Sequence, residues 1–351
     1  MISRNNNFDF LRLIFAVLVV ITHSYPLSGA NGSDFLSQLT FGQMSLSYIG
    51  VKGFFIISGF LIFKSLLHCK NLPDFYWKRI LRLFPALFVV LLLTVALAPA
   101  VYEHHVPYWK NISVYTYIPR NISLFFLQYK INGVFGNNPF PGSINGSLWT
   151  ICYEFSMYIM VSLLFFIRKK SVLKIIVGML FISSYLLAVH ASSFLSSTLL
   201  KAGLDGKNFY DLMCFFTGGM LLTYLNIRDK RLENLLIMFS IIVLAGSVYL
   251  KIVGYTCFFT LPILVIFIGR NSTIYINRIG DVFGDISYGI YIYSFPIQQA
   301  LMYFYKLNTI PLMILSLVLS LLFGYFSWHL IEARALGYKD LVSKRSIHHD
   351  E

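Results

Sequence analysis

Ten long apolar runs constrain what this chain can fold into more than any other feature. Each is long enough to cross about 30 Å of hydrocarbon as a helix. The runs begin near Phe8, Leu46, Ile80, Leu148, Val172, Phe209, Leu235, Ile252, Ile286 and Ile310. Only 12% of the residues are charged, against about 25% in a soluble globular chain, and no run alternates as a membrane β-strand would. The sequence therefore predicts an all-α integral membrane protein, a bundle of about ten transmembrane helices.

The basic residues predict how these helices are oriented. Of the 28 lysines and arginines, twenty lie in alternate connections on one side of the membrane and eight on the other. The positive-inside rule then places both termini in the cytoplasm. Because the net charge of +13 is spread over short clusters between apolar runs, we expect contacts with membrane lipids and no nucleic-acid partner.

Neither the composition nor the cysteines divide the chain further. No charged linker or compositional shift interrupts it, so we expect one transmembrane domain over residues 1–335 and a cytoplasmic tail over residues 336–351. The four cysteines lack paired spacing, which argues against a disulfide framework and a thiolate metal site. We expect no metal.

The first apolar run, FDFLRLIFAVLVVITHSY, carries Arg12 and His23. On a helix the two side chains lie on nearly the same face, separated along the axis by roughly 16 Å at about 1.5 Å per residue. Ionisable groups are costly in hydrocarbon, so they usually face a bundle interior or a wet cavity and serve a function. In the alternative, Arg12 reaches the cytoplasmic headgroups and pairs with Asp9, while His23 sits in the opposite interface.

Two arginines in the segment FYWKRILRLFPALF form the strongest cluster of positive charge. Arg79 and Arg82 lie one helical turn apart on one face. Their guanidinium groups offer rigid paired donors that suit a phosphate, and the alternative is a basic cluster that binds lipid headgroups. Glu332, near the cytoplasmic end of the last run, could balance one of these arginines or Arg12. Arg334, two residues further on, is a simpler partner.

The longest connection outside the membrane runs from Glu103 to Ser147 on the outer side. It contains Arg120 and ends in the turn-rich stretch GNNPFPGSINGS. Connections of this length often shape a binding site, so we expect this one to contribute to a binding site on the outer side.

Glu154 lies about two turns inside the run that follows this connection, where an ionised carboxylate needs a partner. His23 is one candidate, because a neighbouring carboxylate would fix the imidazole tautomer and raise its basicity. Hydrogen bonds to tyrosines such as Tyr153 or Tyr158 are the alternative.

Six motifs occur in order along the chain: RLIFAVLVVITH, GVKGFFIISGFLI, RILR before LFP, NGSLWTICYE, ISYGIYIYSFPI and a final LIE. Together they resemble the membrane acyltransferase-3 family over nearly the whole sequence. The resemblance implies transfer of an acyl group, usually acetyl from cytoplasmic acetyl-CoA, to a hydroxyl of a bacterial surface carbohydrate. It also implies that His23 is the catalytic histidine and that Arg12 belongs to its motif. Arg79 and Arg82 would then engage the phosphates of the coenzyme.

Two departures from the family pattern limit these expectations. Many members end in an extracellular esterase-like SGNH domain, and this chain stops soon after its last run, so any such second step would need another protein. Ser294 occupies a place where many relatives have histidine, so we assign no acid–base chemistry there.

We therefore hypothesise a stand-alone O-acetyltransferase of the bacterial inner membrane that modifies a surface polysaccharide, such as O-antigen, capsule or exopolysaccharide, or its lipid-linked precursor. Acetyl-CoA is the donor substrate, and we expect no permanently bound cofactor. The expected catalytic residues are His23, Glu154 and Arg12, those for the coenzyme are Arg79, Arg82 and Arg12, and those for the acceptor are Trp149, Tyr153, Tyr288, Asp34 and Arg120. The alternative is a polytopic transporter of a lipid-linked sugar or an acyl donor, with buried charges along its path.

Overall fold

The computed structural model describes residues 6–225, 227, 229–273 and 275–342. Regular secondary structure in these residues is helical, apart from one isolated antiparallel bridge between Tyr102 and Val134. The predicted all-α class is therefore confirmed. Residues 343–351 of the expected tail lie outside the described residues.

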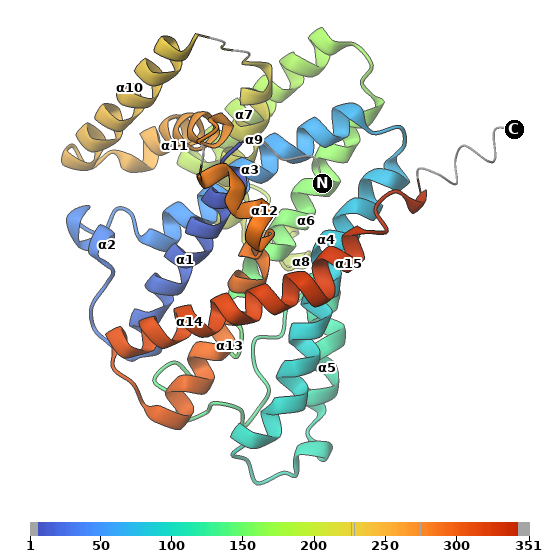
Figure 1. The fold of residues 1–351 in the computed structure, drawn as a ribbon, viewed down its shortest axis with the longest axis vertical. Coiled ribbons are helices and arrows are strands. Elements are labelled where there is room, and N and C mark those ends of the chain that lie inside the picture. The colour runs from blue at the N-terminus through green and yellow to red at the C-terminus, as the bar shows by residue number, and fades with distance from the viewer. Residues whose placement is uncertain (1–5, 226, 228, 274, 343–351) are drawn as a thin grey trace, which may run out of the picture. The chain divides into compact units, whose positions relative to one another are not determined.

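Eight helices of the described residues are long and apolar enough to cross a membrane (Figure 1). Their α-helical parts are α1 (Phe8–Leu27), α3 (Leu46–His68), α4 (Leu72–Leu97), α6 (Trp149–Ser162), α7 (Lys170–His190), α10 (Lys230–Tyr249), α11 (Val253–Arg270) and α14 (Thr309–Ser327). The chain is thus a multi-pass membrane protein.

Two further helices stand where the remaining apolar runs were expected. Helix α9 (Gly206–Leu221) has 16 residues, and α13 (Ser287–Tyr305) has 19 residues with buried serine, tyrosine and glutamine side chains. Neither combines the length and the apolar character of the other eight. The shorter helices are α2 (Phe35–Leu39), α5 (Ile112–Ile122), α8 (Ser196–Lys201), α12 (Ile279–Phe283) and α15 (Ala333–Leu336).

Local capping side chains explain where several helices begin. Asn71 accepts a hydrogen bond from the backbone N–H of Asp74 and so caps α4. Pro73 follows in the first turn, where the missing N–H of proline has no cost. Asp205 and Asp229 cap α9 and α10 in the same way.

The described helices form two compact units, and the boundary falls within α1 and within α6. The α3 unit contains α1 up to Phe15, together with Phe35–His68 and Tyr153–Val282. The α13 unit contains Ala16–Asp34, Cys69–Cys152 and the chain from Phe283 onward.

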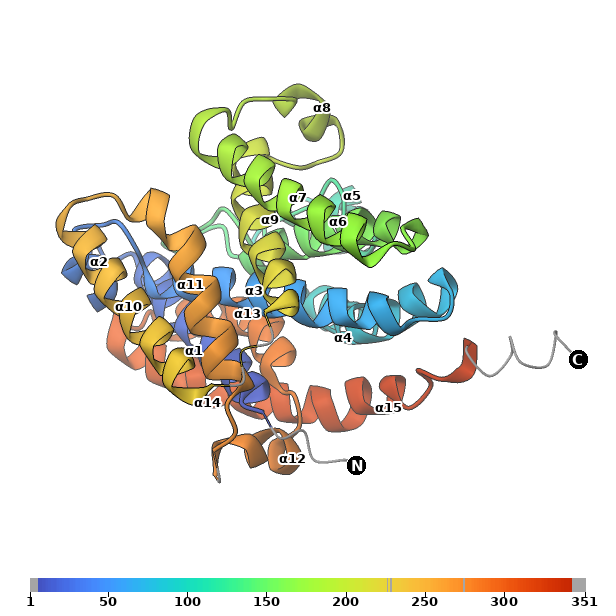
Figure 2. The same cartoon turned by 90° about the horizontal axis from the view of Figure 1, so that it is seen from above.

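In the α3 unit, α3 and α9 approach each other through glycines. A methyl group added to Gly59 of α3 would lie 1.9 Å from the carbonyl oxygen of Phe216. One added to Gly219 of α9 would lie 2.1 Å from the carbonyl oxygen of Ile56. Small residues of this kind let membrane helices pack backbone to backbone. Helices α7 and α9 also lie side by side, as do α10 and α11 (Figure 2).

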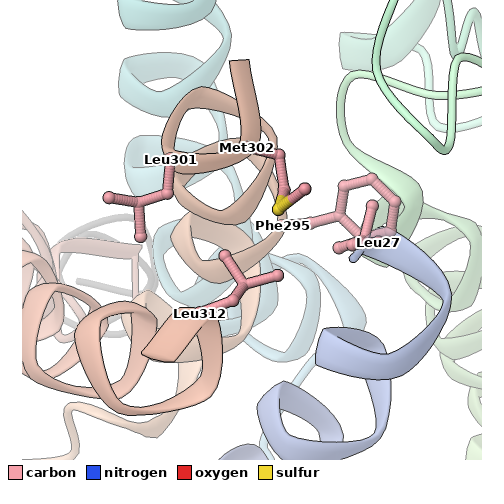
Figure 3. Packing of buried hydrophobic residues seen from close by; sticks show 5 residues of the cluster. All are labelled: Leu27, Phe295, Leu301, Met302 and Leu312. Atoms are coloured by element: carbon pink, nitrogen blue, oxygen red, sulfur yellow. The ribbon is translucent and has the colours of Figure 1, made fainter. Parts of the chain in front are cut away.

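In the α13 unit, α13 packs along α14, and Gly289 of α13 meets the backbone of Gly324. A buried apolar cluster joins the end of α1 to these two helices (Figure 3). Its members are Leu27, Phe295, Leu301, Met302 and Leu312. Helix α14 continues into a single π-helical turn, Trp328–Glu332.

Replacing Gly219 with alanine should destabilise the protein, because the new methyl group would overlap the carbonyl of Ile56. We expect Gly219→Ala to reduce the free energy of unfolding by about 1–3 kcal/mol, the usual cost of overpacking a core, and to lower the melting temperature in detergent. Gly246→Ala in α10 is the matched control, because nothing lies within 4 Å of the methyl group added there. An unchanged melting temperature for Gly219→Ala would contradict the close packing of α3 on α9.

Candidate active site

His23 lies in the α13 unit, in the second half of α1. Its imidazole is half-buried and meets the ring of Phe295 from α13 edge to face, with 5.3 Å between the ring centroids. The Nδ1 atom is buried and has no hydrogen-bond partner among the described residues. Of the two ring nitrogens, Nε2 is therefore the one that we consider for chemistry.

The outer loop, which we define as residues 138–150, covers the other side of Phe295. The ring of Phe140 packs against that of Phe295 at 6.1 Å between centroids. A methyl group added to Gly146 would lie 2.5 Å from the Phe295 ring. The loop therefore reaches the aromatic side chain that touches His23, and its role at the acceptor site stays a prediction.

Hydrogen bonds hold one end of the outer loop against α13. The side-chain amide of Asn145 donates to the carbonyl oxygen of Ile292 at 2.8 Å, and its oxygen accepts from the backbone N–H of Ser147. The hydroxyl of Thr150 lies 2.8 Å from that of Tyr291. Asn145, Ser147 and Thr150 are all buried, so this part of the loop belongs to the protein interior.

Gln299 holds the other end of the outer loop. Its amide nitrogen donates to the carbonyl oxygens of Phe140 at 2.8 Å and Ser143 at 2.6 Å. Its amide oxygen accepts from the side chain of Asn138 at 2.7 Å. Both N–H groups and the oxygen of this fully buried amide bond the loop, so α13 fixes the path of the loop.

Asp34, expected to contact the acceptor, is only 1% exposed. Its carboxylate accepts a hydrogen bond of 2.8 Å from the hydroxyl of Thr22, the residue before His23. In this structure Asp34 anchors the helix turn that carries the histidine.

Arg82 lies within a cluster of two carboxylates at the other end of α13. Its guanidinium donates to Asp285 at 2.7 Å and to Glu332 at 3.4 Å. The hydroxyls of Ser287 and Ser327 donate to the remaining oxygens of these carboxylates at 2.6 and 2.8 Å. Arg82 is therefore bonded to two carboxylates, and a phosphate would have to compete with both for its guanidinium.

The aromatic side chains around Arg82 complete this cluster. Its guanidinium lies 5.8 Å from the ring centre of Tyr288 and 5.7 Å from that of Trp328. The hydroxyl of Tyr288 donates to the carbonyl oxygen of Leu83 at 3.0 Å. Tyr288, expected at the acceptor, thus lies beside a residue expected to bind the coenzyme.

Arg79, one turn before Arg82, is 9% exposed, and its guanidinium lies 4.8 Å from the ring centre of Phe75. Lys78, beside it, pairs with Asp74 at 2.7 Å. Arg79 is therefore a buried cation near the predicted cytoplasmic end of α4.

Arg12 belongs to the α3 unit, where it forms an ion pair with Asp9. This is the pairing that the sequence offered as the alternative to a role inside the bundle. The catalytic role of Arg12 stays a prediction.

Glu154 and Tyr153 also lie in the α3 unit, on α6. One oxygen of Glu154 accepts from the hydroxyls of Ser58 at 2.7 Å and Tyr158 at 2.5 Å. The hydrogen bond to a tyrosine, which the sequence offered as the alternative to His23, is therefore present. A pairing of Glu154 with His23 stays a prediction. The buried Tyr153 hydroxyl accepts from the backbone N–H of Asp205 and so supports the start of α9.

The two remaining candidates for the acceptor differ in exposure. Trp149 is the first residue of α6, where the outer loop passes into the helix, and is half-buried. Arg120 lies in the last turn of α5 and is exposed. Neither role is tested by these positions.

A cavity of about 360 Å³ lies in the α13 unit between α4, α13 and α14. Its lining is almost entirely apolar and includes Pro296 and Ile297, but no residue predicted to bind or catalyse. A cavity of this character suits hydrocarbon better than a sugar or a nucleotide, so it is not the candidate active site.

Sequence reasoning did not identify Asp285, Phe295 or Gln298 as parts of these clusters. The signal in the sequence was weak. One carboxylate, Asp285, precedes the polar run of α13, and two amides, Gln298 and Gln299, follow it. Their partners lie on α1, α4 and α14, far away in the sequence, so no local pattern reveals the pairing.

The fold and the site together define a multi-pass helical membrane protein whose first helix presents an imidazole beside a buried loop. The model of the acyltransferase domain matches residues 5–329. The chain belongs to the acyltransferase-3 family, as its motifs predicted, and it is an acyltransferase.

Curated relatives extend over different shares of the chain. It is 31% identical over 341 residues to an O-acetyl transferase of Shigella phage Sf6, covering 95% of this chain and 96% of the relative. It is 30% identical over 207 residues to nodulation protein 10 of Rhizobium leguminosarum bv. viciae, covering 54% of this chain and 52% of the relative. No solved structure matches the chain.

Replacing Arg82 with methionine should destabilise the protein, because Asp285 and Glu332 would lose their shared cation. Removing one partner of a buried ion cluster costs about 3–5 kcal/mol, and we expect a loss of this size in thermal unfolding. The triple variant R82M/D285N/E332Q should recover part of it, since it leaves no carboxylate unpaired. Lys130→Met, at an exposed position of the same unit, is the control. A triple variant no more stable than R82M would refute the cluster.

Proposed function

We propose that this protein transfers an acetyl group from cytoplasmic acetyl-CoA to a hydroxyl of a cell-surface polysaccharide or its lipid-linked precursor. The family supplies the reaction class, acyl transfer. The name of the relative that aligns over nearly the whole chain, an O-acetyl transferase, supports oxygen as the accepting atom and acetyl as the group. Membership of an acyltransferase family decides against the transporter considered above.

The observation that carries the proposal is the setting of His23. Its ring packs edge to face against Phe295, its Nδ1 is buried, and the outer loop reaches the same aromatic side chain. A general base needs a lone pair that can reach a substrate and a ring that keeps its orientation. The contact with Phe295 supports the second requirement, and we propose that Nε2 supplies the first.

The proposed reaction moves one proton and exchanges one bond. His23 takes the proton of the sugar hydroxyl at Nε2, and the oxygen attacks the thioester carbonyl carbon. The carbon–sulfur bond then breaks, and the coenzyme leaves as a thiol with the proton from the imidazolium. In a second route Nε2 attacks the carbonyl itself and passes the acetyl group to the sugar. Both routes use the same atom of His23.

The coenzyme side of the proposal rests on Arg79, Arg82 and Arg12. Arg79 is a buried cation at the predicted cytoplasmic end of α4, a position suited to a phosphate. Arg82 is bonded to two carboxylates. We therefore assign it first a structural role at the start of α13 and second a contact with the phosphates. Arg12, which is paired with Asp9, would lie along the path of the pantetheine arm.

The acceptor side rests on the outer loop and the residues near it. Trp149 offers an indole face to a sugar ring, and Tyr153, Tyr288, Asp34 and Arg120 complete the set that we propose. Glu154 would support the imidazole electrostatically. For Asp34 we propose action through Thr22, because its carboxylate is buried against that hydroxyl.

For the membrane arrangement, we infer ten crossings, with α9 and α13 completing the eight apolar spans, and both termini in the cytoplasm. The excess of basic residues in alternate connections supports this orientation. The bacterial inner membrane is the compartment in which cytoplasmic acetyl-CoA and an outer glycan can both reach such a protein.

Replacing His23 with alanine should abolish acetyl transfer, because general bases contribute about 100-fold or more to turnover. The measurement is transfer of radiolabelled acetyl groups to the polysaccharide by membranes with matched protein levels, and mass spectrometry of the glycan in cells. His105→Ala, at an exposed position outside the spans, is the control. Full O-acetylation by the His23→Ala protein would refute the assigned role.

Replacing Arg79 with glutamine should weaken acetyl-CoA binding and leave glycan binding unchanged. Hydrogen bonds to charged groups contribute about 1.5–3 kcal/mol, so we expect the Kd for acetyl-CoA to rise about tenfold or more. Titration calorimetry on the purified protein measures this, with Lys110→Gln on the outer side as control. Equal Kd values for the R79Q and wild-type proteins would remove Arg79 from the coenzyme site.

A further inference from the structure

Gln298 joins α13 to the turn of α1 that carries His23. Its side chain is fully buried, and its amide nitrogen donates to the hydroxyl oxygen of Ser316 in α14 at 3.2 Å. On α1 the same nitrogen donates to the carbonyl oxygen of Val20 at 3.0 Å and to the hydroxyl oxygen of Ser24 at 2.8 Å. These two residues lie three positions before and one position after His23. The amide therefore contacts α1 on both sides of the histidine.

The orientation of this amide follows from its partners. A backbone carbonyl such as that of Val20 can only accept, and the Ser24 hydroxyl already donates to the same carbonyl at 3.0 Å. The nitrogen of Gln298 must therefore face α1. Its oxygen is buried without a hydrogen-bond partner among the described residues. An apolar side chain would avoid this unsatisfied acceptor, so the bonds that the nitrogen donates to α1 and to Ser316 are what this position retains.

The turn around His23 needs support from outside the helix. Pro26 lies within α1 and has no N–H, so the carbonyl of Thr22 loses its partner four residues on. The Thr22 side chain is held by Asp34, and Val20 and Ser24 are held by Gln298. Phe295, one turn before Gln298 on α13, meets the imidazole itself.

We propose that Gln298 is a positioning residue for His23. It does not touch the reacting atoms; it fixes the backbone and the neighbouring hydroxyl from which the imidazole projects, and so holds Nε2 toward the substrate. The inference rests on the proposed function, in which His23 is the base or the nucleophile. A catalytic group displaced by about 1 Å loses much of its effect on turnover.

Gln298→Met tests this, because methionine has a similar length but no donor. We expect kcat for acetyl transfer to fall about tenfold or more, while the KM for acetyl-CoA stays within about twofold. Deuterium uptake should rise in the segment from Val20 to Ser28 and not in α7 or α11. Ser320→Ala is the matched control, since this hydroxyl in α14 is buried without a partner among the described residues; it should change neither value.

Ser24→Ala removes one of the three acceptors of the Gln298 amide, and one of the two on α1, and gives a second, independent test. The double variant S24A/Q298M should be no slower than Q298M, because both changes remove the same contact. Multiplied losses in the double variant would show that Gln298 acts elsewhere and would overturn the proposal.

Three further results would also overturn it. One is unchanged kcat and deuterium uptake in Q298M. A second is raised uptake around His23 with unchanged kcat, which would leave Gln298 a purely structural role. A third is raised uptake in all helices with a lower melting temperature, which would show a general loss of packing. If the wild-type protein transfers no acetyl group, the proposed function fails, and the uptake pattern alone then decides whether Gln298 holds this turn.

Discussion

Backbone groups that are buried away from water must find hydrogen-bond partners within the protein, and non-helical backbone has the greatest need. Residues 138–150 meet this need through α13. Gln299 binds the carbonyls of Phe140 and Ser143, and Asn145 reaches the carbonyl of Ile292. The same dependence explains why α13 is the polar member of the helix set. Gln299 and Tyr291 hold the loop on one side, and Gln298 holds α1 on another.

Helix α13 also separates two polar regions of different character. Near its start, Arg82 and two carboxylates form a charged cluster with serine hydroxyls on every remaining carboxylate oxygen. Near its other end, neutral amides and one imidazole replace the charges. Gln298 follows Asp285 by thirteen positions, which is roughly 20 Å along a helix. The proposed function assigns the coenzyme to the charged end and the sugar hydroxyl to the neutral end. At the charged end the phosphates would compete with Asp285 and Glu332 for Arg82.

Much of this architecture is visible in the sequence, and the reason is physical. Hydrocarbon requires long apolar helices, so hydropathy predicts the all-α fold class and the positions of the long helices, including α9 and α13. Spacing within one helix predicts that Arg12 and His23 lie on nearly the same face. It also predicts Asp9 as a possible partner of Arg12 and a tyrosine as a possible partner of Glu154. Contacts between distant segments are different. Arg82 was one of several possible partners for Glu332, and Asp285 was not considered. Lys52 pairs with Asp211, a residue far away in the sequence. Such choices depend on tertiary packing, which a single sequence does not encode locally.

The π turn at the end of α14 has a consequence of its own. A π turn contains one residue more than an α turn, so every side chain after it is rotated by about 100° from the course of a regular helix. Ser327 and Glu332 stand at the two ends of this turn and are hydrogen-bonded to each other. Shortening the segment by a single residue would restore a regular helix. The Glu332 carboxylate would then point in a different direction around the helix axis and away from its present partners. Selection on this stretch therefore acts on its length as well as on its side chains, and an insertion or deletion here would be harder to tolerate than most substitutions.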